Sequence, residues 1–412
     1  MGFMHHPFPM QIFRAYDIRG KVSLLNVSMV NAIAHGLAQQ YQSAGQTRAA
    51  IGYDARLSSP TYAHIIQRTL SLYAIEAHII GCCSSPMLYY TSREFGGNGI
   101  MITASHNPRE DNGIKWLINN QPPCPEMIQA VGLEAQKYYS DELQQVDWIE
   151  HEIIPEYCLK YQQSILNDIQ LKRRYRVVLD GLNGSAGRCA ALVLNKLGCD
   201  LTTIRTEANG HFPDHAPDPS QEAHLQLLKA KVLETRADLG IALDGDGDRL
   251  VLIDADGQVI TADQLLCLCA EICLKDTVDK EFVFDVKCST LVRNTVQALG
   301  AKPVMIRTGS SFLRKYLANS QGQAIFGGEY AGHYVFNDGR GGGYDDGVYA
   351  ALRVMEYLDQ TGQTLAEALA RYPKRTGTED LYVSTHQIKP LESLNFVEAQ
   401  SRKLNAQISK ID

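Results

Sequence analysis

The sequence contains no apolar run that approaches the roughly 20 residues needed to cross a bilayer as a helix. Residues 1–10 include two histidines and two prolines, and they lack the basic region and apolar core that mark a secretory signal. We therefore expect a cytoplasmic protein with no membrane partner.

Positive charge is also scarce. The chain has 39 Lys and Arg against 46 Asp and Glu, which gives a formal net charge of −7. A general nucleic-acid binder needs a strong positive bias, so no nucleic-acid partner is expected. A small phosphorylated ligand is compatible with this composition, because a local cluster of Arg and Lys can hold one in an acidic protein.

The ten cysteines form no framework of disulfides or metal ligands. Cys82 and Cys83 are adjacent in sequence, and they are therefore poorly placed to pair with each other. Cys267, Cys269 and Cys273 lie in one apolar run, and no second pair of the C-x-x-C kind accompanies them. We expect buried thiols in a reducing compartment.

Short apolar strands alternate with longer helical patterns along most of the 412 residues. A strand at 49–53 precedes helical spacing over 60–73, and the alternation restarts at 175–180 and again at 262–274. Strands separated by helices of this length favour parallel or mixed α/β layers. We predict an α/β protein with three similar domains in tandem, at residues 1–151, 152–258 and 259–372.

Three aspartates alternate with glycines directly after the apolar strand at 239–243. They are Asp244, Asp246 and Asp248. In an extended loop alternate side chains point the same way, so the three carboxylates can converge on one cation. Carboxylate oxygens suit Mg²⁺ or Ca²⁺ and not Zn²⁺. An EF-hand calcium loop would need glycine and glutamate where this chain has Arg249 and Ala255, which excludes that loop type.

The motif TASHNP, at residues 103–108, also follows a predicted strand. Pro108 disfavours helix at the preceding residue and favours a sharp loop. The loop would display Ser105 at the carboxyl end of the strand, where open α/β sheets place their chemistry. There the serine can act as a nucleophile beside His106 or as a phosphate carrier. The G-x-S-x-G elbow of hydrolases is absent, because Ala104 precedes the serine.

Two further segments with glycine carry polar side chains. FRAYDIRG, at residues 13–20, contains Arg14, Tyr16 and Arg19, and its guanidinium groups suit a phosphate or a surface salt-bridge cluster equally well. GGEYAGH, at residues 327–333, places Glu329 and His333 in a loop after a strand. These two side chains can bond sugar hydroxyl groups or form an ordinary polar loop.

In their order along the chain, the four motifs resemble those of the α-D-phosphohexomutase superfamily, most closely its bacterial phosphomannomutase/phosphoglucomutase branch. The similarity runs from Phe13 to about Pro373. It implies three topologically similar α/β domains and a smaller fourth one, with the active site in the central cleft. The implied enzyme is an isomerase, an intramolecular phosphotransferase that interconverts hexose 1-phosphate and hexose 6-phosphate of mannose, glucose or both.

The resemblance also implies cofactors and a phosphate carrier. Ser105 would carry the phosphoryl group, and a bisphosphorylated sugar (glucose 1,6-bisphosphate or mannose 1,6-bisphosphate) would act as activator and intermediate. Mg²⁺ would be held by the phosphorylated serine and the three aspartates of the second motif. Small hexose phosphates are the expected partners, and we expect a monomer or a weak dimer.

The remaining site residues are implied by position. Arg19 matches an arginine near the transferring phosphate, and Lys115 matches a lysine that assists proton transfer. Arg249, next to the aspartates, would supply positive charge around the transferring oxygens. A buried lysine among cations is expected to have a lowered pKa. His106 would orient its loop or shuttle a proton. The residues expected to bind the sugar phosphate are Tyr16, Lys287, Thr308, Glu329 and His333.

Some positions depart from the family pattern. Related enzymes usually have serine where this chain has Ala331, and close relatives carry histidine in the T-G-x-S loop where this chain has Ser310. No R-x-S-N-T-E-P loop, which grips the non-transferring phosphate in the family, follows Pro373. We expect residues 373–412 to form an incomplete fourth domain, and the chain to hold phosphate on Ser105 but to turn over poorly.

Three alternatives stay open at this stage. A phosphoglucosamine mutase would use the same chemistry on another sugar. A phosphatase would use an aspartate as its nucleophile, and its activity would survive replacement of Ser105. A non-catalytic protein would bind hexose phosphates without any exchange of phosphate.

Overall fold

The computed structural model describes residues 8–140, 149–274, 279–373 and 390–404. Within these ranges the strands form three sheets of one design. Each sheet contains the same unit of four strands, in which the first strand in sequence (residues 48–53, 176–180 or 281–285) lies between the second and the third, and these three run parallel. A fourth strand pairs antiparallel with the third. The chain therefore folds as three tandem α/β domains with mixed sheets, which confirms the predicted fold class.

The first sheet has one additional strand. Its order is β1-β5-β4-β2-β3, and the strands are β1 (Ile18–Lys21), β2 (Arg48–Tyr53), β3 (Glu76–Cys82), β4 (Gly99–Ile102) and β5 (Asp111–Leu117). Strand β1 carries part of the FRAYDIRG motif and pairs antiparallel with β5, so that Arg19 lies opposite Gly113. This pairing brings the N-terminal motif beside the edge of the sheet from which the TASHNP loop leaves.

The second and third sheets repeat the arrangement without the extra strand. The second contains β6 (Arg176–Asp180), β7 (Asp200–Ile204), β8 (Leu239–Leu243) and β9 (Leu250–Asp254), and the third contains β10 (Glu281–Asp285), β11 (Lys302–Ile306), β12 (Ala324–Gly328) and β13 (Tyr334–Phe336). Every residue of β8 and of β12 is buried, as expected for central strands covered on both faces.

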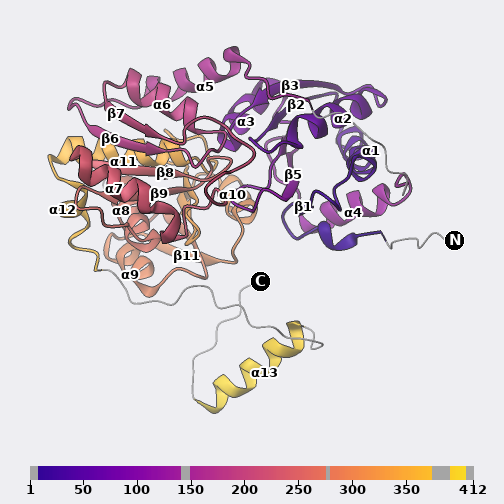
Figure 1. The fold of residues 1–412 in the computed structure, drawn as a ribbon. Helices are drawn as coiled ribbons and strands as arrows, with labels where there is room; N and C mark the ends of the chain where they lie inside the picture. Colours follow the sequence, from indigo (N-terminus) through magenta and orange to yellow (C-terminus); the bar gives the residue numbers. More distant parts are fainter. Residues whose placement is uncertain (1–7, 141–148, 275–278, 374–389, 405–412) are drawn as a thin grey trace.

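Helices cover the sheets and join the strands (Figure 1). The first domain contains η1 (Met10–Ile12), α1 (Val27–Ser43), α2 (Ser59–Ser71), α3 (Ser85–Ser92), η2 (Arg93–Phe95) and α4 (Pro125–Ala135), and the second contains α5 (Pro155–Asp168), α6 (Gly187–Lys196), η3 (Glu222–Leu225) and α7 (Gln226–Thr235). The third contains α8 (Ala262–Leu274), α9 (Thr290–Ala298), α10 (Ser310–Asn319), α11 (Gly347–Thr361) and α12 (Leu365–Leu369). Side chains cap the N-termini of several helices. The Asp346 carboxylate, for example, accepts a hydrogen bond from Tyr349 N at 2.9 Å at the start of α11.

The repeated topology puts three motifs in equivalent places. The TASHNP loop connects β4 to β5, the aspartate loop connects β8 to β9, and the GGEYAGH segment connects β12 to β13. Each connection joins the third strand of its sheet to the antiparallel fourth. The sequence pattern predicted the parallel strands but not this shared antiparallel edge.

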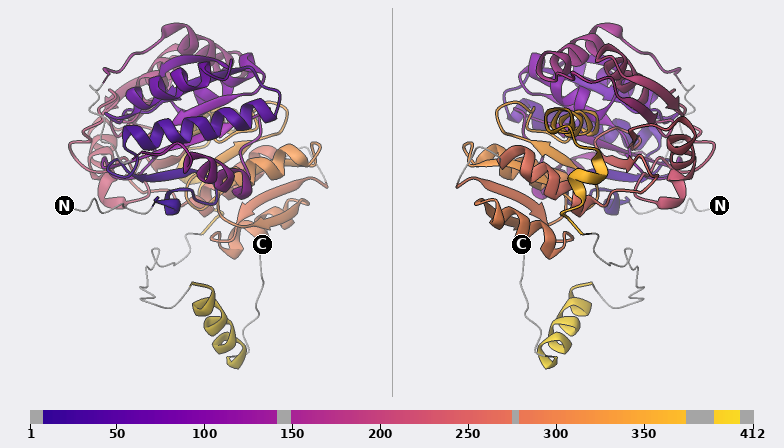
Figure 2. Two further views of the ribbon diagram at one scale, coloured as in Figure 1. Left: turned by 90° about the vertical axis from the view of Figure 1, so that its right-hand side faces the viewer. Right: turned by 90° about the vertical axis from the view of Figure 1, so that its left-hand side faces the viewer.

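The predicted domain limits at residues 151, 258 and 372 stay predictions. Of the expected fourth domain, residues 374–389 and 405–412 lie outside the described residues. Residues 390–403 form α13 (Pro390–Lys403), which Figure 2 shows apart from the three sheets. No helix in the described ranges is long and apolar enough to span a membrane.

All ten cysteines are free thiols, and seven of them are buried. Cys124, Cys158 and Cys288 are only half-buried. The expectation of buried thiols is therefore confirmed for most of them and wrong for these three.

Candidate active site

A cavity of about 250 Å³ receives side chains from all four motifs. The first domain supplies Ser105, His106 and Lys115, the second supplies Arg249, and the third supplies Glu329 and His333. The other lining residues are Arg14, Tyr16, Asp17, Arg19, Asn107, Trp116, Pro122, Pro123, Thr308, Gly309, Ser310, Ser311, Arg314 and Ala331.

Ser105 is held in a strained and buried loop. Its φ of 51° is in the left-handed region, which is uncommon for a residue with a side chain and is enriched at functional sites. Its backbone N–H donates to Thr103 Oγ1 at 2.8 Å, and Thr103 Oγ1 donates in turn to Asp54 at 2.8 Å. These hydrogen bonds stabilise the strained conformation.

Arg56 organises the backbone of the same loop. Its guanidinium donates to the carbonyl oxygens of Ser105 (2.8 Å), Asn107 (2.7 Å), Pro108 (2.6 Å) and Asp111 (3.0 Å). The side chain is almost completely buried and is neutralised by Asp54 at 3.0 Å. Because one rigid cation satisfies four carbonyl groups, the loop is fixed before any ligand binds.

The Ser105 hydroxyl points at the aspartate loop. Ser105 Oγ donates to Asp244 Oδ2 at 2.6 Å and lies 3.3 Å from His106 Nδ1. The two loops touch through their backbones as well, since a Cβ on Gly245 would lie 2.5 Å from the Ser105 carbonyl oxygen. Only glycine allows this approach.

The aspartate loop presents three fully buried carboxylates whose oxygens come within 4.8 Å of one another. Asp246 Oδ1 and Asp248 Oδ1 have no hydrogen-bond partner among the described residues. A buried carboxylate oxygen normally has such a partner, so these two oxygens fit a cation that accepts their lone pairs. The donor set, which is all oxygen, suits Mg²⁺.

The protein compensates the charge of these carboxylates unevenly. Burial, followed by the charges of Asp248 and Asp246, raises the pKa of Asp244 well above its ordinary value. Burial acts in the same direction on Asp246, but Lys115 and the hydroxyl of Ser85 lower the pKa of this carboxyl. Ser85 Oγ donates to Asp246 Oδ2 at 2.6 Å.

Lys115 corrects one expectation. Its Nζ donates to Asp246 Oδ2 at 2.9 Å and to Asp248 Oδ2 at 3.0 Å. Burial alone would lower the pKa of Lys115, but these two carboxylates raise it well above its ordinary value. The prediction of a lowered pKa was wrong because carboxylates, and not cations, are the nearest neighbours.

His106 is neutral in this environment. Burial lowers its pKa far below the ordinary value, and the charges of Arg249 and Arg19 act in the same direction. A neutral imidazole can accept a proton from the neighbouring Ser105 hydroxyl or orient it.

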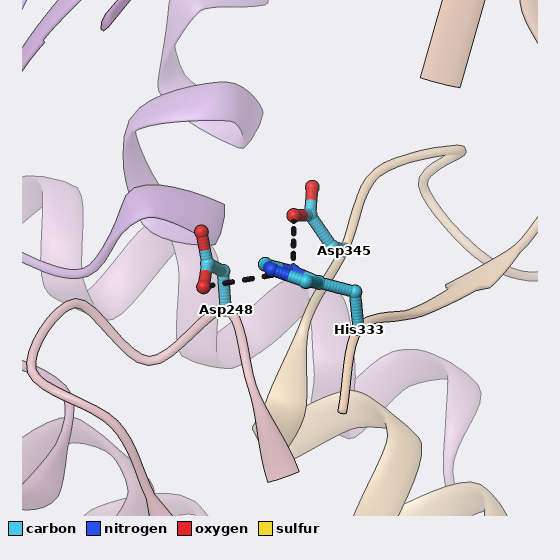
Figure 3. Close-up of side chains that lie close together, drawn as sticks. All are labelled: Asp248, His333 and Asp345. Atoms are coloured by element: carbon cyan, nitrogen blue, oxygen red, sulfur yellow. Dashed lines mark ion pairs between the residues drawn. The ribbon is translucent and has the colours of Figure 1, made fainter. Parts of the chain in front are cut away.

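The third domain adds a buried carboxylate and histidine to the aspartate loop (Figure 3). His333 Nδ1 lies 2.8 Å from Asp345 Oδ2 and 3.7 Å from Asp248 Oδ1. Burial lowers the pKa of His333, but the charge of Asp248 and the hydrogen bond with Asp345 raise it overall. These three residues also form a group that could hold a cation, and here the imidazole already occupies the space between the two carboxylates.

Arg249 connects the second and third domains. Its Nε donates to His333 Nε2 at 3.0 Å, and its backbone N–H donates to Asp244 Oδ1 at 3.2 Å. A guanidinium can only donate, so His333 Nε2 is an acceptor in this arrangement and Nδ1, which lies 2.8 Å from Asp345 Oδ2, carries the proton.

Glu329 and Arg314 complete the wall formed by the third domain. Glu329 is 2% exposed and accepts a hydrogen bond from Gly309 N, and burial raises the pKa of its carboxyl. Arg314 Nε lies 3.4 Å from Asp345 Oδ1, and its guanidinium stacks 4.2 Å from the centre of the Tyr89 ring. On the opposite side, Arg19 pairs with Asp17 at 2.6 Å.

The structure brings most of the predicted site residues together. Lys287 is the exception, because it is exposed and is not among the described residues that line the cavity. Arg56, Asp345 and Arg314 were missed. The sequence shows an arginine two residues after Asp54, and it shows the pair Asp345-Asp346 before a helix. Neither spacing is specific enough to predict a functional role.

Three sequence profiles of one family match the chain in order. They are "Phosphoglucomutase/phosphomannomutase, alpha/beta/alpha domain I" over residues 10–140, domain II over residues 156–257 and domain III over residues 261–375.

Individual proteins are similar over nearly the whole chain. The phosphomannomutase/phosphoglucomutase of Pseudomonas syringae pv. tomato is 33% identical over 416 residues, which cover 98% of this chain and 86% of the relative. A phosphoglucomutase of Neisseria gonorrhoeae is 34% identical over 90% of this chain and 80% of its own. The crystal structure of a phosphoglucomutase/phosphomannomutase family protein from Burkholderia thailandensis matches with a TM-score of 0.82 at 29% identity, over 90% of this chain and 82% of that one.

Proposed function

This chain belongs to the phosphoglucomutase/phosphomannomutase family, and from that premise we propose that it interconverts hexose 1-phosphates and hexose 6-phosphates through a phosphoryl group carried on Ser105. The substrates are mannose phosphate, glucose phosphate or both. Two transfers make up one cycle. Phospho-Ser105 gives its group to the free hydroxyl of the sugar phosphate, and the bisphosphorylated sugar then returns its other phosphoryl group to the serine.

One observation carries the proposal. The Ser105 hydroxyl is buried in a strained loop, 2.6 Å from Asp244 and within a cavity that also receives Glu329 and His333 from another domain. Phosphoryl transfer needs alignment and positive charge more than covalent chemistry. Arg19, Arg249 and Lys115 supply that charge around the serine.

The residues that would hold Mg²⁺ are Asp244, Asp246, Asp248 and the Ser105 side chain, as the two partnerless carboxylate oxygens support. When bound, Mg²⁺ neutralises charge on the phosphoryl oxygens. Lys115 forms ion pairs with two of the proposed cation ligands, Asp246 and Asp248, so the lysine lies directly beside the proposed Mg²⁺ site.

Other side chains would bind the sugar and move protons. Glu329, whose carboxyl has a raised pKa, suits hydrogen bonds with sugar hydroxyls. His333 also lines the cavity, with Nε2 accepting the hydrogen bond of Arg249 and Nδ1 beside Asp345, and we propose that it holds Arg249 in place beside the substrate. The proton-accepting role falls to His106, which lies 3.3 Å from Ser105 Oγ. Tyr16 and Thr308 line the same cavity and are proposed to contact the substrate.

The sugar preference depends on the loops of the third domain. Ala331 and Ser310 both line the cavity, and each departs from the residue that related enzymes usually carry. Among the described residues, neither side chain forms a hydrogen bond with the three aspartates or with Ser105, so we propose that these two positions alter sugar choice and leave phosphoryl transfer unchanged. Competition between glucosamine phosphate and glucose or mannose phosphate in the same assay would show which of these substrates the enzyme prefers.

The test is intact-protein mass spectrometry before and after incubation with Mg²⁺ and glucose 1,6-bisphosphate, followed by mutase assays with glucose 1-phosphate and mannose 1-phosphate. We expect the gain of one phosphoryl group, its absence in Ser105→Ala, and isomerisation by the unmodified chain only. A phosphorylated Ser105→Ala protein, or hydrolysis that survives this substitution, would replace the proposal with a phosphatase. Binding of hexose phosphates with neither phosphorylation nor isomerisation would support a non-catalytic binding protein.

A further inference from the structure

Asp285 lies at the end of the middle strand of the third sheet. It is the last residue of β10, which pairs in parallel with β11 on one side and with β12 on the other. The side chain is fully buried, and it is not among the described residues that line the cavity. Because the carboxyl ends of parallel strands meet at one edge of a sheet, an aspartate at this position can reach the loops that follow both neighbouring strands.

The two carboxylate oxygens of Asp285 accept hydrogen bonds from these two loops. Oδ2 accepts from Thr308 Oγ1 at 2.8 Å, in the loop that follows β11. Oδ1 accepts from Tyr330 N at 3.1 Å, in the connection that follows β12, and from Cys288 Sγ at 3.1 Å. A buried carboxylate is costly without such donors, so the loops that supply them are held to Asp285 and, through it, to each other.

The same two loops also meet on the side that faces the cavity. Thr308 and Glu329 line the cavity, and Gly309 N donates a hydrogen bond to Glu329 Oε1. The residue after Thr308 is therefore bonded to the residue before Tyr330. One hydrogen bond joins the loops at the cavity, and Asp285 joins them from the interior of the domain, so the separation between Thr308 and Glu329 is fixed from both sides.

The other two domains have a buried aspartate in the same place. Asp54 directly follows β2 and accepts a hydrogen bond from Thr103 Oγ1, after β4, at 2.8 Å. Asp180 ends β6 and accepts one from Arg205 Nε, after β7, at 3.0 Å. In each domain the aspartate at the end of the middle strand holds a loop that follows a neighbouring strand. In the first domain this loop carries Ser105, whereas in the third domain both loops face the proposed sugar site.

We propose that Asp285 is a positioning residue for the sugar phosphate, because it fixes the distance between the two loops of the third domain that contact the substrate. This inference rests on the proposed function, in which Thr308 and Glu329 bind the sugar phosphate. The Asp285 carboxylate does not touch the substrate, and it acts through the hydroxyl of Thr308 and the backbone of Tyr330. A binding site of this kind needs its groups in place to within about 0.5 Å, which the two hydrogen bonds supply.

The test is isothermal titration calorimetry of the full chain, with Mg²⁺ alone and then with glucose 1-phosphate in the presence of Mg²⁺. We expect Asp285→Ala to weaken glucose 1-phosphate binding by at least about tenfold, since a misplacement of about 1 Å can cost about 100-fold where alignment matters. The affinity for Mg²⁺ should stay unchanged, because the three aspartates proposed to bind it belong to the second domain. Asp285→Asn should bind glucose 1-phosphate almost as the unmodified chain does, because its amide oxygen accepts from Tyr330 N and its amide nitrogen can donate to Thr308 Oγ1.

Asp180→Ala is the matched control. It removes the equivalent buried aspartate of the second domain, and the loop after β7 that Asp180 holds supplies no described residue of the cavity lining. Glucose 1-phosphate should therefore bind Asp180→Ala as it binds the unmodified chain. Equal losses in Asp180→Ala and Asp285→Ala, or a loss of Mg²⁺ affinity in Asp285→Ala, would mean a general disturbance of the fold and would overturn the inference.

The same titrations separate this inference from the proposed function. An unmodified chain that binds no glucose 1-phosphate would contradict both, whereas equal binding by the unmodified chain and Asp285→Ala would overturn the inference alone. If circular dichroism shows that Asp285→Ala does not fold, Thr308→Val and Thr308→Ser replace it at a half-buried position. Valine breaks the link to Asp285 and serine keeps it, so we expect weaker binding in Thr308→Val only, and equal affinities would overturn the inference.

Discussion

His333 Nδ1 lies 2.8 Å from the carboxylate of Asp345, although the two are twelve positions apart and an antiparallel strand lies between them in the chain. Strand β13 turns the chain back, so that the loop before α11 returns to the histidine that precedes the strand. The buried contact fixes which ring nitrogen is protonated and leaves Nε2 without a hydrogen, so that it accepts the hydrogen bond of Arg249. This arrangement makes Asp345 a positioning residue for the histidine.

We expect Asp345→Asn to lower kcat by about 100-fold with little change in KM, because an amide can hold the imidazole in the wrong tautomer. Steady-state assays with hexose 1-phosphate and Mg²⁺ check this. The surface substitution Asp256→Asn is the control and should leave both constants unchanged. A change confined to KM would show that Asp345 affects substrate binding instead.

Arg56→Ala should lower the free energy of unfolding by about 3 to 5 kcal/mol, because it leaves Asp54 buried and unpaired and four carbonyl groups unsatisfied. Urea unfolding followed by circular dichroism gives this value. Arg109→Ala, at an exposed arginine on the same loop, is the control and should change it by less than about 0.5 kcal/mol. Equal effects of the two substitutions would mean that Arg56 does not hold the loop.

Asp246→Asn should weaken Mg²⁺ binding by at least about tenfold, because it removes the negative charge of one of three converging carboxylates. Isothermal titration calorimetry with Mg²⁺ alone measures the affinity. Glu222→Gln, in η3 and away from the cavity, should bind Mg²⁺ as the unmodified chain does. Unchanged affinity in Asp246→Asn would place the cation elsewhere.

Asp346 predicts a pH dependence of stability. Burial raises the pKa of its carboxyl from 3.8 to about 6, so the folded state holds this proton more tightly than the unfolded chain does. The stabilising contribution is complete below about pH 4 and is lost as the pH rises through 6, by up to about 3 kcal/mol. Asn at this position can still cap α11 but does not titrate.

The measurement for Asp346 is the free energy of unfolding of the unmodified chain and of Asp346→Asn at several pH values between 4 and 7. We expect the difference between them to shift in favour of Asp346→Asn as the pH rises. The comparison cancels the titration of all other groups. Parallel curves would mean that Asp346 stays ionised throughout this range.

Ala331→Ser should raise kcat/KM for at least one hexose phosphate by about two- to tenfold, the gain expected from one added hydrogen bond to a sugar hydroxyl. Competition between glucose 1-phosphate and mannose 1-phosphate identifies the sugar. Ala318→Ser, on α10 outside this cavity, is the matched control. Equal kinetics of the two variants would exclude position 331 from sugar recognition.

The sequence predicted the α/β class, the central strands and the motif that carries Asp244, Asp246 and Asp248, because each depends on local patterns. Apolar strands that alternate with helices indicate parallel strands, and carboxylates at every second position indicate that their side chains point the same way. The antiparallel fourth strands were not predicted, since β9 and β13 follow loops whose length alone does not set strand direction.

Residues that act through partners distant in sequence could not be predicted in the same way. Arg56 binds the carbonyl of Ser105, 49 positions away, and Ser85 reaches Asp246 across 161 positions. The raised pKa of Lys115 has the same origin, because Asp246 and Asp248 arrive from another domain. Such contacts depend on how the domains pack, which no local pattern encodes.

The three equivalent connections between third and fourth strands make the active site modular. Ser105, the proposed phosphate carrier, the three aspartates proposed to bind the cation, and Glu329 with His333 each lie on one of these connections, in one copy of the same sheet. A substitution in the β12–β13 connection can therefore alter the preferred sugar while the β4–β5 and β8–β9 connections keep the chemistry. If the proposed function holds, substrate choice and phosphoryl transfer are separable traits in this architecture, and new sugar specificities can be selected by changes in one loop.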